Sequence, residues 1–320
     1  LNLPQRFTTA EGIGIAESFE EDFQVIDLNA DVPPCKIPEQ NKTINVYRAI
    51  KLGLGDFFRK NGFLSACIGL SGGIDSAVVA ALAAEVLGPE NVHVLLMPSQ
   101  FSSDHSVDDA RILAENLGAR YQIVPITQTF ATLTQTLGPI FGELPFDVTE
   151  ENMQARLRGM MLMALSNKFG HILLNTSNKS ESAVGYGTLY GDSVGAISII
   201  GDLYKSEVYD LARYINRNGE IIPSNTILKA PSAELRPNQK DSDTLLPYDI
   251  LDAILYRMLE EGQSREEIIN AGFDEEDVYH VYGMVIRNEH KRYQFCPVLR
   301  LSSCVLDKNR IMPLTSRYGC

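Results

Sequence analysis

A short glycine-containing segment, Gly69-Leu-Ser-Gly-Gly-Ile-Asp-Ser76, separates an apolar run from an alanine-rich run. Adjacent Gly72 and Gly73 let successive backbone N–H groups converge on an anion, and a helix starting directly after them adds the positive end of its dipole. The hydroxyls of Ser71 and Ser76 can donate to the same oxygens. We therefore expect this segment, from Gly69 onward, to bind a phosphate or pyrophosphate.

Asp75 lies within this segment and changes the expected chemistry. A carboxylate beside a phosphate repels it unless a divalent cation lies between them, and Mg²⁺ is the natural partner of such hard oxygens. The segment lacks the lysine of G-x-x-x-x-G-K-[ST] and does not match G-x-G-x-x-G, which excludes the common P-loop and the dinucleotide fingerprint. The pattern predicts a different kind of magnesium-dependent nucleotide site.

The same segment also fits the nucleophile elbow G-x-S-x-G, which would make Ser71 the nucleophile of a serine hydrolase. Only one expected strand precedes the turn, no H-G-G-G segment is present, and Asp75 would have no role. The hydrolase is therefore the weaker alternative.

A second polar cluster, Asn175-Thr-Ser-Asn-Lys-Ser-Glu181, follows another expected strand. Ligands of doubly wound sheets bind beyond the carboxyl ends of the strands, so Thr176 and Glu181 would face the glycine segment. Glu181 could then share the metal with Asp75, and Lys205 could reach the same phosphates. In the alternative interpretation, Thr176 only caps a helix, and Glu181 and Lys205 form a surface pair of little energetic value.

Alternating strands and helices must position these residues. Apolar runs predict five strands, at 64–69, 92–97, 121–126, 171–175 and 196–200. Periodic stretches predict helices at 41–61, 75–87, 106–117, 149–169 and 202–216, followed by three more at 248–261, 264–271 and 275–290. We therefore predict an α/β fold with a doubly wound parallel five-stranded sheet, order 3-2-1-4-5, and C-terminal helices.

The chain divides into two expected parts. Residues 1–40 lack a sustained period and contain three prolines close together near their end, which is typical of an arm or linker, so the folded domain is expected over 41–320. Residues 221–247 contain four prolines and no period. A loop this long in a compact domain suggests a lid.

Composition limits the partners. The chain has 28 basic and 41 acidic residues and a net charge of −13, the wrong sign for a broad nucleic-acid surface. Its longest apolar runs are far shorter than the ~20 residues that cross a membrane. The five cysteines form no C-x-x-C pair, which favours reduced thiols and a cytoplasmic protein.

Two longer strings carry a family resemblance. S-G-G-x-D-S after a first strand resembles the pyrophosphate loop of the ATP pyrophosphatase group, which splits ATP to AMP and pyrophosphate. The string LNTSNKSESAVGYGTLYGD at 174–192, with GDLYK at 201–205, is similar to the NAD synthetases of that group. The resemblance covers most of the chain from about residue 41. It implies ATP-dependent amidation of deamido-NAD to NAD through an acyl-adenylate that ammonia attacks.

The resemblance also implies roles for individual residues. Asp75 and Glu181 would hold Mg²⁺, while Thr176, Lys205 and Ser232 would contact ATP together with the glycine segment. The deamido-NAD contacts would be Arg156, His290 and Lys291, and Asp192 would lie at the ammonia site. Without the resemblance, Arg156 and Arg158 would count as ordinary surface charges of a helix.

The source of nitrogen and the partners follow from the same resemblance. Leu189 resembles the glutamine-dependent branch, whose members carry an N-terminal glutaminase domain, and residues 18–28 resemble the connector after it. The expected protein is the synthetase part of such an enzyme, commonly a homodimer, without its glutaminase domain. The alternatives are another ATP pyrophosphatase with a different acceptor, and a nucleotide-binding module without chemistry.

Overall fold

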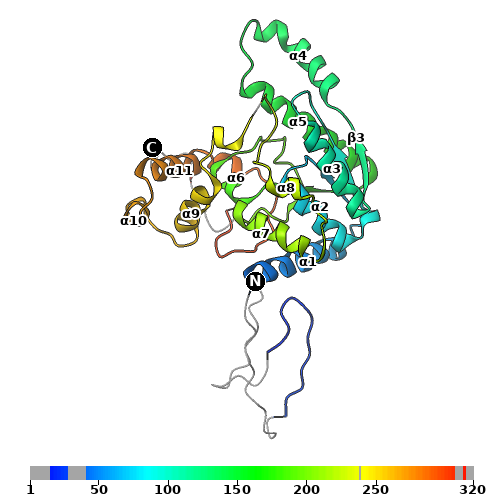
Figure 1. Cartoon of the computed structure of the whole chain (residues 1–320), viewed down its shortest axis with the longest axis vertical. Coiled ribbons are helices and arrows are strands. Elements are labelled where there is room, and N and C mark those ends of the chain that lie inside the picture. The colour runs from blue at the N-terminus through cyan, green and yellow to red at the C-terminus, as the bar shows by residue number, and fades with distance from the viewer. Residues whose placement is uncertain (1–14, 28–40, 238, 307–312, 315–320) are drawn as a thin grey trace.

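Five parallel strands form the centre of the computed structural model, which describes residues 15–27, 41–237, 239–306 and 313–314 (Figure 1). The strands are β1 (Ala66–Gly69), β2 (Val92–Leu96), β3 (Arg120–Ile123), β4 (Ile172–Asn175) and β5 (Ile197–Ser198). Their order is β3-β2-β1-β4-β5, as predicted. Because the order reverses between β1 and β4, the carboxyl ends of these strands flank the crevice where such sheets bind ligands.

One face of the sheet is covered by α1 (Lys42–Asn61), α2 (Ile74–Leu87), α3 (Asp104–Leu117) and α7 (Lys205–Ile215). Alternation along each strand decides which side chains join this layer, since successive residues point to opposite faces. Ile68 therefore packs into the main core with the alanine-rich α2, which is buried along nearly its whole length.

The opposite face packs on α5 (Val148–Phe169). Cys67 points to this side, and burial raises the pKa of its thiol to about 12. It is therefore a core residue and not a nucleophile. Before α5 comes α4 (Thr127–Phe141), which projects from the body of the molecule at the top of Figure 1.

A second apolar core lies beside the sheet. It joins α6 (Lys179–Val184) to α9 (Tyr248–Leu259), α10 (Arg265–Asn270) and α11 (Glu275–Arg287), and the short α12 (Glu289–Arg292) follows. Because α6 belongs to this core, the C-terminal helices fix the polar cluster that follows β4. Among the described residues, none of the helices is both long and apolar enough to span a bilayer.

The structure differs from the predicted elements in several places. Strand β5 has two residues in place of the expected five, and α7 begins at Lys205 rather than at residue 202. The helices α4, α6, α8 (Ser224–Leu228) and α12 were not predicted as separate elements. The 221–247 loop is not irregular throughout, because it contains α8 and a 3₁₀ turn at Asp241–Asp243. Most of the predicted arm at 1–40 lies outside the described residues.

Candidate active site

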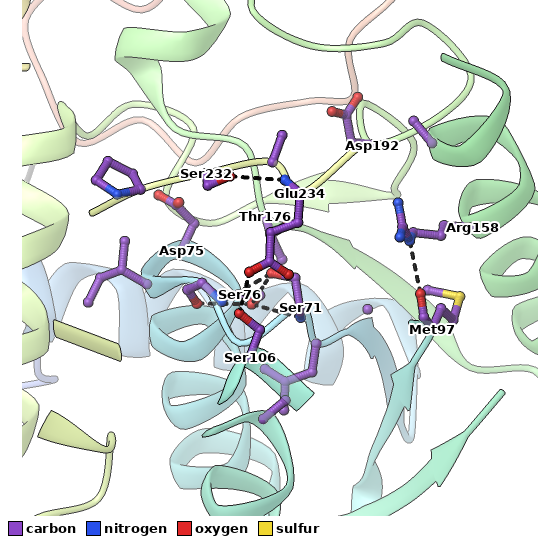
Figure 2. Close-up of a pocket in the computed structure, with 18 of the residues that line it drawn as sticks. Ser71, Asp75, Ser76, Met97, Ser106, Arg158, Thr176, Asp192, Ser232 and Glu234 are labelled. Atoms are coloured by element: carbon purple, nitrogen blue, oxygen red, sulfur yellow. Dashed lines mark hydrogen bonds between the residues drawn. The ribbon is translucent and has the colours of Figure 1, made fainter. Parts of the chain in front are cut away.

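A pocket opens at the carboxyl ends of β1, β2 and β4 (Figure 2). Its wall consists of the glycine segment, the loop after β2, one side of α5, the polar cluster after β4, and residues 229–235 of the proline-containing loop. The two polar clusters singled out in the sequence thus face one cavity, because β1 and β4 are neighbours in the sheet.

The glycine segment forms a tight turn into α2. Gly72 has φ +80°, and a Cβ built on it would lie 2.2 Å from the carbonyl oxygen of Ser106. Gly73 is the N-cap of α2 and has no side chain. The first N–H groups of the helix therefore have no side-chain cap. The hydroxyls of Ser71 and Ser76 lie 3.2 Å apart, and Ser71 Oγ accepts from the Gly73 N–H. This turn has the donors that a pyrophosphate requires.

Lys205 joins two carboxylates at the side of this turn. Its Nζ lies 2.6 Å from Asp75 Oδ2 and 3.0 Å from Glu181 Oε1. Asn178, the N-cap of α6, donates to Asp75 Oδ1 at 2.9 Å. All three charges are largely buried, so this is not the surface pair of the alternative interpretation.

The pKa values within this cluster follow from its charges. Burial raises the pKa of Glu181 to about 7, and repulsion by Asp75 and Asp241 adds to this effect while Lys205 opposes it. Burial alone would lower the pKa of Lys205, but attraction by Asp75 and Glu181 outweighs it and raises that pKa. The Lys205 ammonium therefore stays charged. The negative charges around Glu181 exceed the single positive charge of this lysine.

Eight charged residues line the pocket, five of them acidic and three basic: Asp75, Glu181, Asp192, Glu234, Asp241, Arg158, Lys205 and Lys229. Such a wall repels a polyphosphate, so a bound divalent cation fits the donor set. Within the described part of the chain, no three acidic, histidine or cysteine side chains gather closely enough to hold a metal by themselves. Proteins commonly hold Mg²⁺ by one or two carboxylates together with substrate phosphates, and Asp75 and Glu181 are two carboxylates that line the pocket.

The proline-containing loop is tied to the pocket by polar contacts. Glu234, with φ +49°, accepts from the hydroxyls of Ser103 and Ser106 at the start of α3. Lys229 pairs with Asp109 on the same helix at 3.1 Å. Ser232 lies on this stretch, lines the pocket, and donates to the carbonyl of Gln239 at 2.6 Å.

The other residues expected at the site lie around it. Thr176 and Asp192 line the pocket (Figure 2). Lys291 donates to the carbonyls of Gly185 and Gly187, and its charge acts on the carboxyl of Asp192. His290 is exposed beside it and contacts the carbonyl of Arg287. These two lie behind the turn that carries Asp192 rather than among the residues that line the pocket.

The two arginines of α5 separate. Arg156 is exposed and donates to the carbonyl of Leu189, whereas Arg158 lines the pocket and donates through Nε to the carbonyl of Met97 at 3.0 Å. The interpretation of Arg158 as an ordinary surface charge, which applied only without the family resemblance, therefore does not fit the structure. Helical spacing indicates its position, because Arg158 lies one turn before buried Leu162 and therefore on the same face of α5. Glu234 and Asp241 were also missed, and no pattern in their loop marks them.

The pocket does not suit a serine hydrolase. Within the described structure no histidine lines it, and the hydroxyl of Ser71 contacts Ser76 and the loop backbone. A doubly wound sheet with a glycine turn, uncapped helix N–H groups and a largely buried acidic pair with lysine is instead the arrangement of a nucleotide-binding α/β protein.

Comparison with known proteins narrows this class. The family described as NAD synthase matches residues 46–295. The chain is 47% identical over 313 residues to a glutamine-dependent NAD(+) synthetase of Synechocystis sp., covering 96% of this chain and 56% of that protein. It is 49% identical over 275 residues to the corresponding protein of Thermotoga maritima, covering 85% of this chain and 48% of that one. The chain belongs to the NAD synthase family.

Solved structures agree with this assignment. A glutamine-dependent NAD+ synthetase from Acinetobacter baumannii, in complex with ADP, has a TM-score of 0.66 and 38% identity, covering 94% of this chain and 56% of that one. An NMN synthetase from Francisella tularensis has a TM-score of 0.68 and 28% identity, covering 78% of this chain and 95% of that one. The chain thus spans about half the length of its glutamine-dependent relatives.

Proposed function

We propose that this chain catalyses the ATP-dependent amidation of deamido-NAD to NAD, with release of AMP and pyrophosphate. The observation that carries the proposal is the cluster of Asp75, Lys205 and Glu181 beside the uncapped turn into α2, in a chain of the NAD synthase family. A turn of N–H donors with a lysine and two carboxylates suits ATP cleavage between the α- and β-phosphates.

A carboxylate is a poor acyl donor to ammonia, because it has no good leaving group, so the reaction needs two steps. The nicotinate carboxylate attacks the α-phosphorus of ATP, a P–O bond forms, and pyrophosphate leaves. Ammonia then attacks the acyl carbon of the adenylate, and AMP leaves. In this proposal the turn from Gly69 to Ser76 holds the pyrophosphate, Lys205 offsets charge on the phosphoryl oxygens, and Thr176 and Ser232 contact the nucleotide.

The metal belongs to the same proposal. Asp75 and Glu181 would hold Mg²⁺ together with the phosphates, and the cation would supply neutralisation of the leaving group. Asp241 adds negative charge that favours cation binding, since its field acts on Glu181. The loop at 221–247 would close over ATP and exclude water from the adenylate, with Ser232 making closure part of ATP binding.

The acceptor and nitrogen sites complete the proposal. Arg156, His290 and Lys291 would contact deamido-NAD, and Asp192 would bind ammonia as ammonium. We expect a homodimer, as the family resemblance of the sequence implies. We also expect a glutaminase unit as the natural source of nitrogen, because the relatives of which this chain covers about half are glutamine-dependent.

One experiment tests the proposal. The purified chain is incubated with ATP, Mg²⁺ and deamido-NAD, with ammonium in one reaction and glutamine in the other, and nucleotides are separated by chromatography. We expect NAD and AMP in equal amounts in the reaction with ammonium, and neither in the reaction with glutamine. AMP without NAD would mean that the chain splits ATP without amidating deamido-NAD, and would refute the proposed acceptor. Intact ATP in both reactions would favour a binding module and refute the proposal.

A further inference from the structure

Arg158 is a cation in the pocket wall whose terminal guanidinium nitrogens make no hydrogen bond to the described part of the chain. Its Nε donates to the carbonyl of Met97 at 3.0 Å, which fixes the plane of the guanidinium. Within the described part of the chain, no hydrogen bond or ion pair joins its two terminal nitrogens to the protein. The side chain remains partly accessible because it borders the cavity (Figure 2).

The other basic residues of the pocket are paired. Lys205 contacts Asp75 and Glu181, and Lys229 contacts Asp109. Burial lowers the pKa of Arg158 to about 10, while the charges of Glu234 and Asp192 act in the opposite direction, so it stays protonated at neutral pH. Its terminal nitrogens have no hydrogen-bonded counterion in the described part of the chain, and an anionic ligand group in the pocket would supply one.

The phosphates have their own donors on the other side of the pocket. Asp75 and Ser76 lie on one side of the view in Figure 2, and Arg158 lies on the opposite side with Asp192 above it. Arg158 is therefore placed for an anion other than the pyrophosphate.

Arg158 and Asp192 are held together by close packing of the backbone. A Cβ on Gly159, the residue after Arg158, would lie 2.8 Å from the carbonyl oxygen of Gly191, the residue before Asp192. A Cβ on Gly191 would lie 2.9 Å from that of Ala155. Helix α5 and this turn thus fix a guanidinium and a carboxylate on one wall, the pair needed beside a bound anion and an incoming ammonium.

From this geometry we infer that Arg158 binds the nicotinate carboxylate of the acceptor and selects the acid over the amide; the inference rests on the proposed function. A guanidinium donates two parallel N–H bonds to a carboxylate, and the fixed plane of Arg158 leaves its terminal nitrogens for this purpose. The product carries a carboxamide, whose NH₂ group cannot accept such a bond. Arg158 therefore holds the substrate and favours release of the product.

Binding measurements test the inference without turnover. Dissociation constants of deamido-NAD and of NAD are measured by calorimetry, with Mg²⁺ and α,β-methylene-ATP present, for the unmodified chain, Arg158→Met and Arg158→Lys. The two dinucleotides differ only in carboxylate against carboxamide. The unmodified chain should prefer deamido-NAD, and Arg158→Met should lose about 10- to 100-fold of that preference, the range expected for charge-assisted hydrogen bonds. Arg158→Lys should retain part of it.

Controls separate the outcomes. Arg111→Met, on the exposed surface of α3 with ion pairs to Asp108 and Glu115, should leave both constants unchanged. Equal weakening of both dinucleotides by Arg158→Met, or no change in either, would overturn the inference while leaving the proposed function intact. An unmodified chain that binds neither dinucleotide would overturn both. If circular dichroism shows that Arg158→Met does not fold, Arg158→Gln, which is neutral but polar, replaces it in the same measurement.

Discussion

Substituting Gly72 by alanine tests whether the glycine turn into α2 depends on a residue without a side chain. Two costs follow from the structure. Its φ of +80° lies in the left-handed region, which costs an L-residue about 1–2 kcal/mol. The new Cβ would also lie 2.2 Å from the carbonyl oxygen of Ser106, and such overpacking adds about 1–3 kcal/mol. Together we expect about 2–5 kcal/mol, a large part of the roughly 5–15 kcal/mol that stabilises a typical domain.

The assay is thermal unfolding followed by circular dichroism. At ~2–4 °C per kcal/mol for a chain of this size, Gly72→Ala should lower Tm by roughly 4–20 °C and weaken ATP binding, because the N-terminus of α3 must move away. Gly73→Ala is the matched control, since Gly73 has φ −80° and its Cβ would meet only the Ser71 hydroxyl at 3.2 Å. A Tm for Gly72→Ala equal to that of Gly73→Ala would refute the reasoning.

Three further predictions concern titratable side chains in other parts of the structure. Lys205→Met should reduce AMP formation by about 10²-fold or more, because it removes the positive charge beside Glu181, and Lys205→Arg should retain more activity in the same assay. Lys179→Met leaves Glu260 without its buried partner and should cost about 3–5 kcal/mol in urea denaturation, whereas a loss below about 1 kcal/mol would contradict a structural role. His93 and His171 stack with ring centroids 3.9 Å apart, and burial lowers both pKa values. The neutral pair therefore contributes fully to the stability of the fold above the ordinary histidine pKa of 6.5, and this contribution is lost as pH falls below it. Between pH 8 and 5, Tm should fall less for His171→Gln than for the unmodified chain.

The sheet was predictable because buried parallel strands appear as apolar runs between helical periods. The order followed from the position of the glycine turn after the first strand and of a second polar cluster after the fourth. Strand β5 was overestimated, because residues 199–200 are as apolar as the strand but pack into the core outside the ladder. Helix α4 was missed because its many threonines and internal Pro139 resemble a loop.

The site was predictable only where local sequence carries the chemistry. Asp75 belongs to the glycine segment itself, and Glu181 and Lys205 belong to strings with a family resemblance. Asp241 reaches the pocket from a long loop. Of its two hydrogen-bond partners, Tyr186 lies far away along the chain and Tyr248 lies at the start of α9. Such contacts depend on tertiary packing, which no local period encodes.

The outer edge of the sheet is completed by the last part of the described chain. Ser198 in β5 donates to the carbonyl of Pro297 and accepts from the N–H of Leu299, and Asp202 accepts from the N–H groups of Leu301 and Ser302. During synthesis, about a hundred further residues must therefore be added after β5 before the segment that pairs with its edge exists. Until then the edge is exposed to pairing with other chains. A chain shortened before residue 297 would keep the ATP-binding strands yet lose the protection of this edge, so solubility would depend on a segment remote from the chemistry.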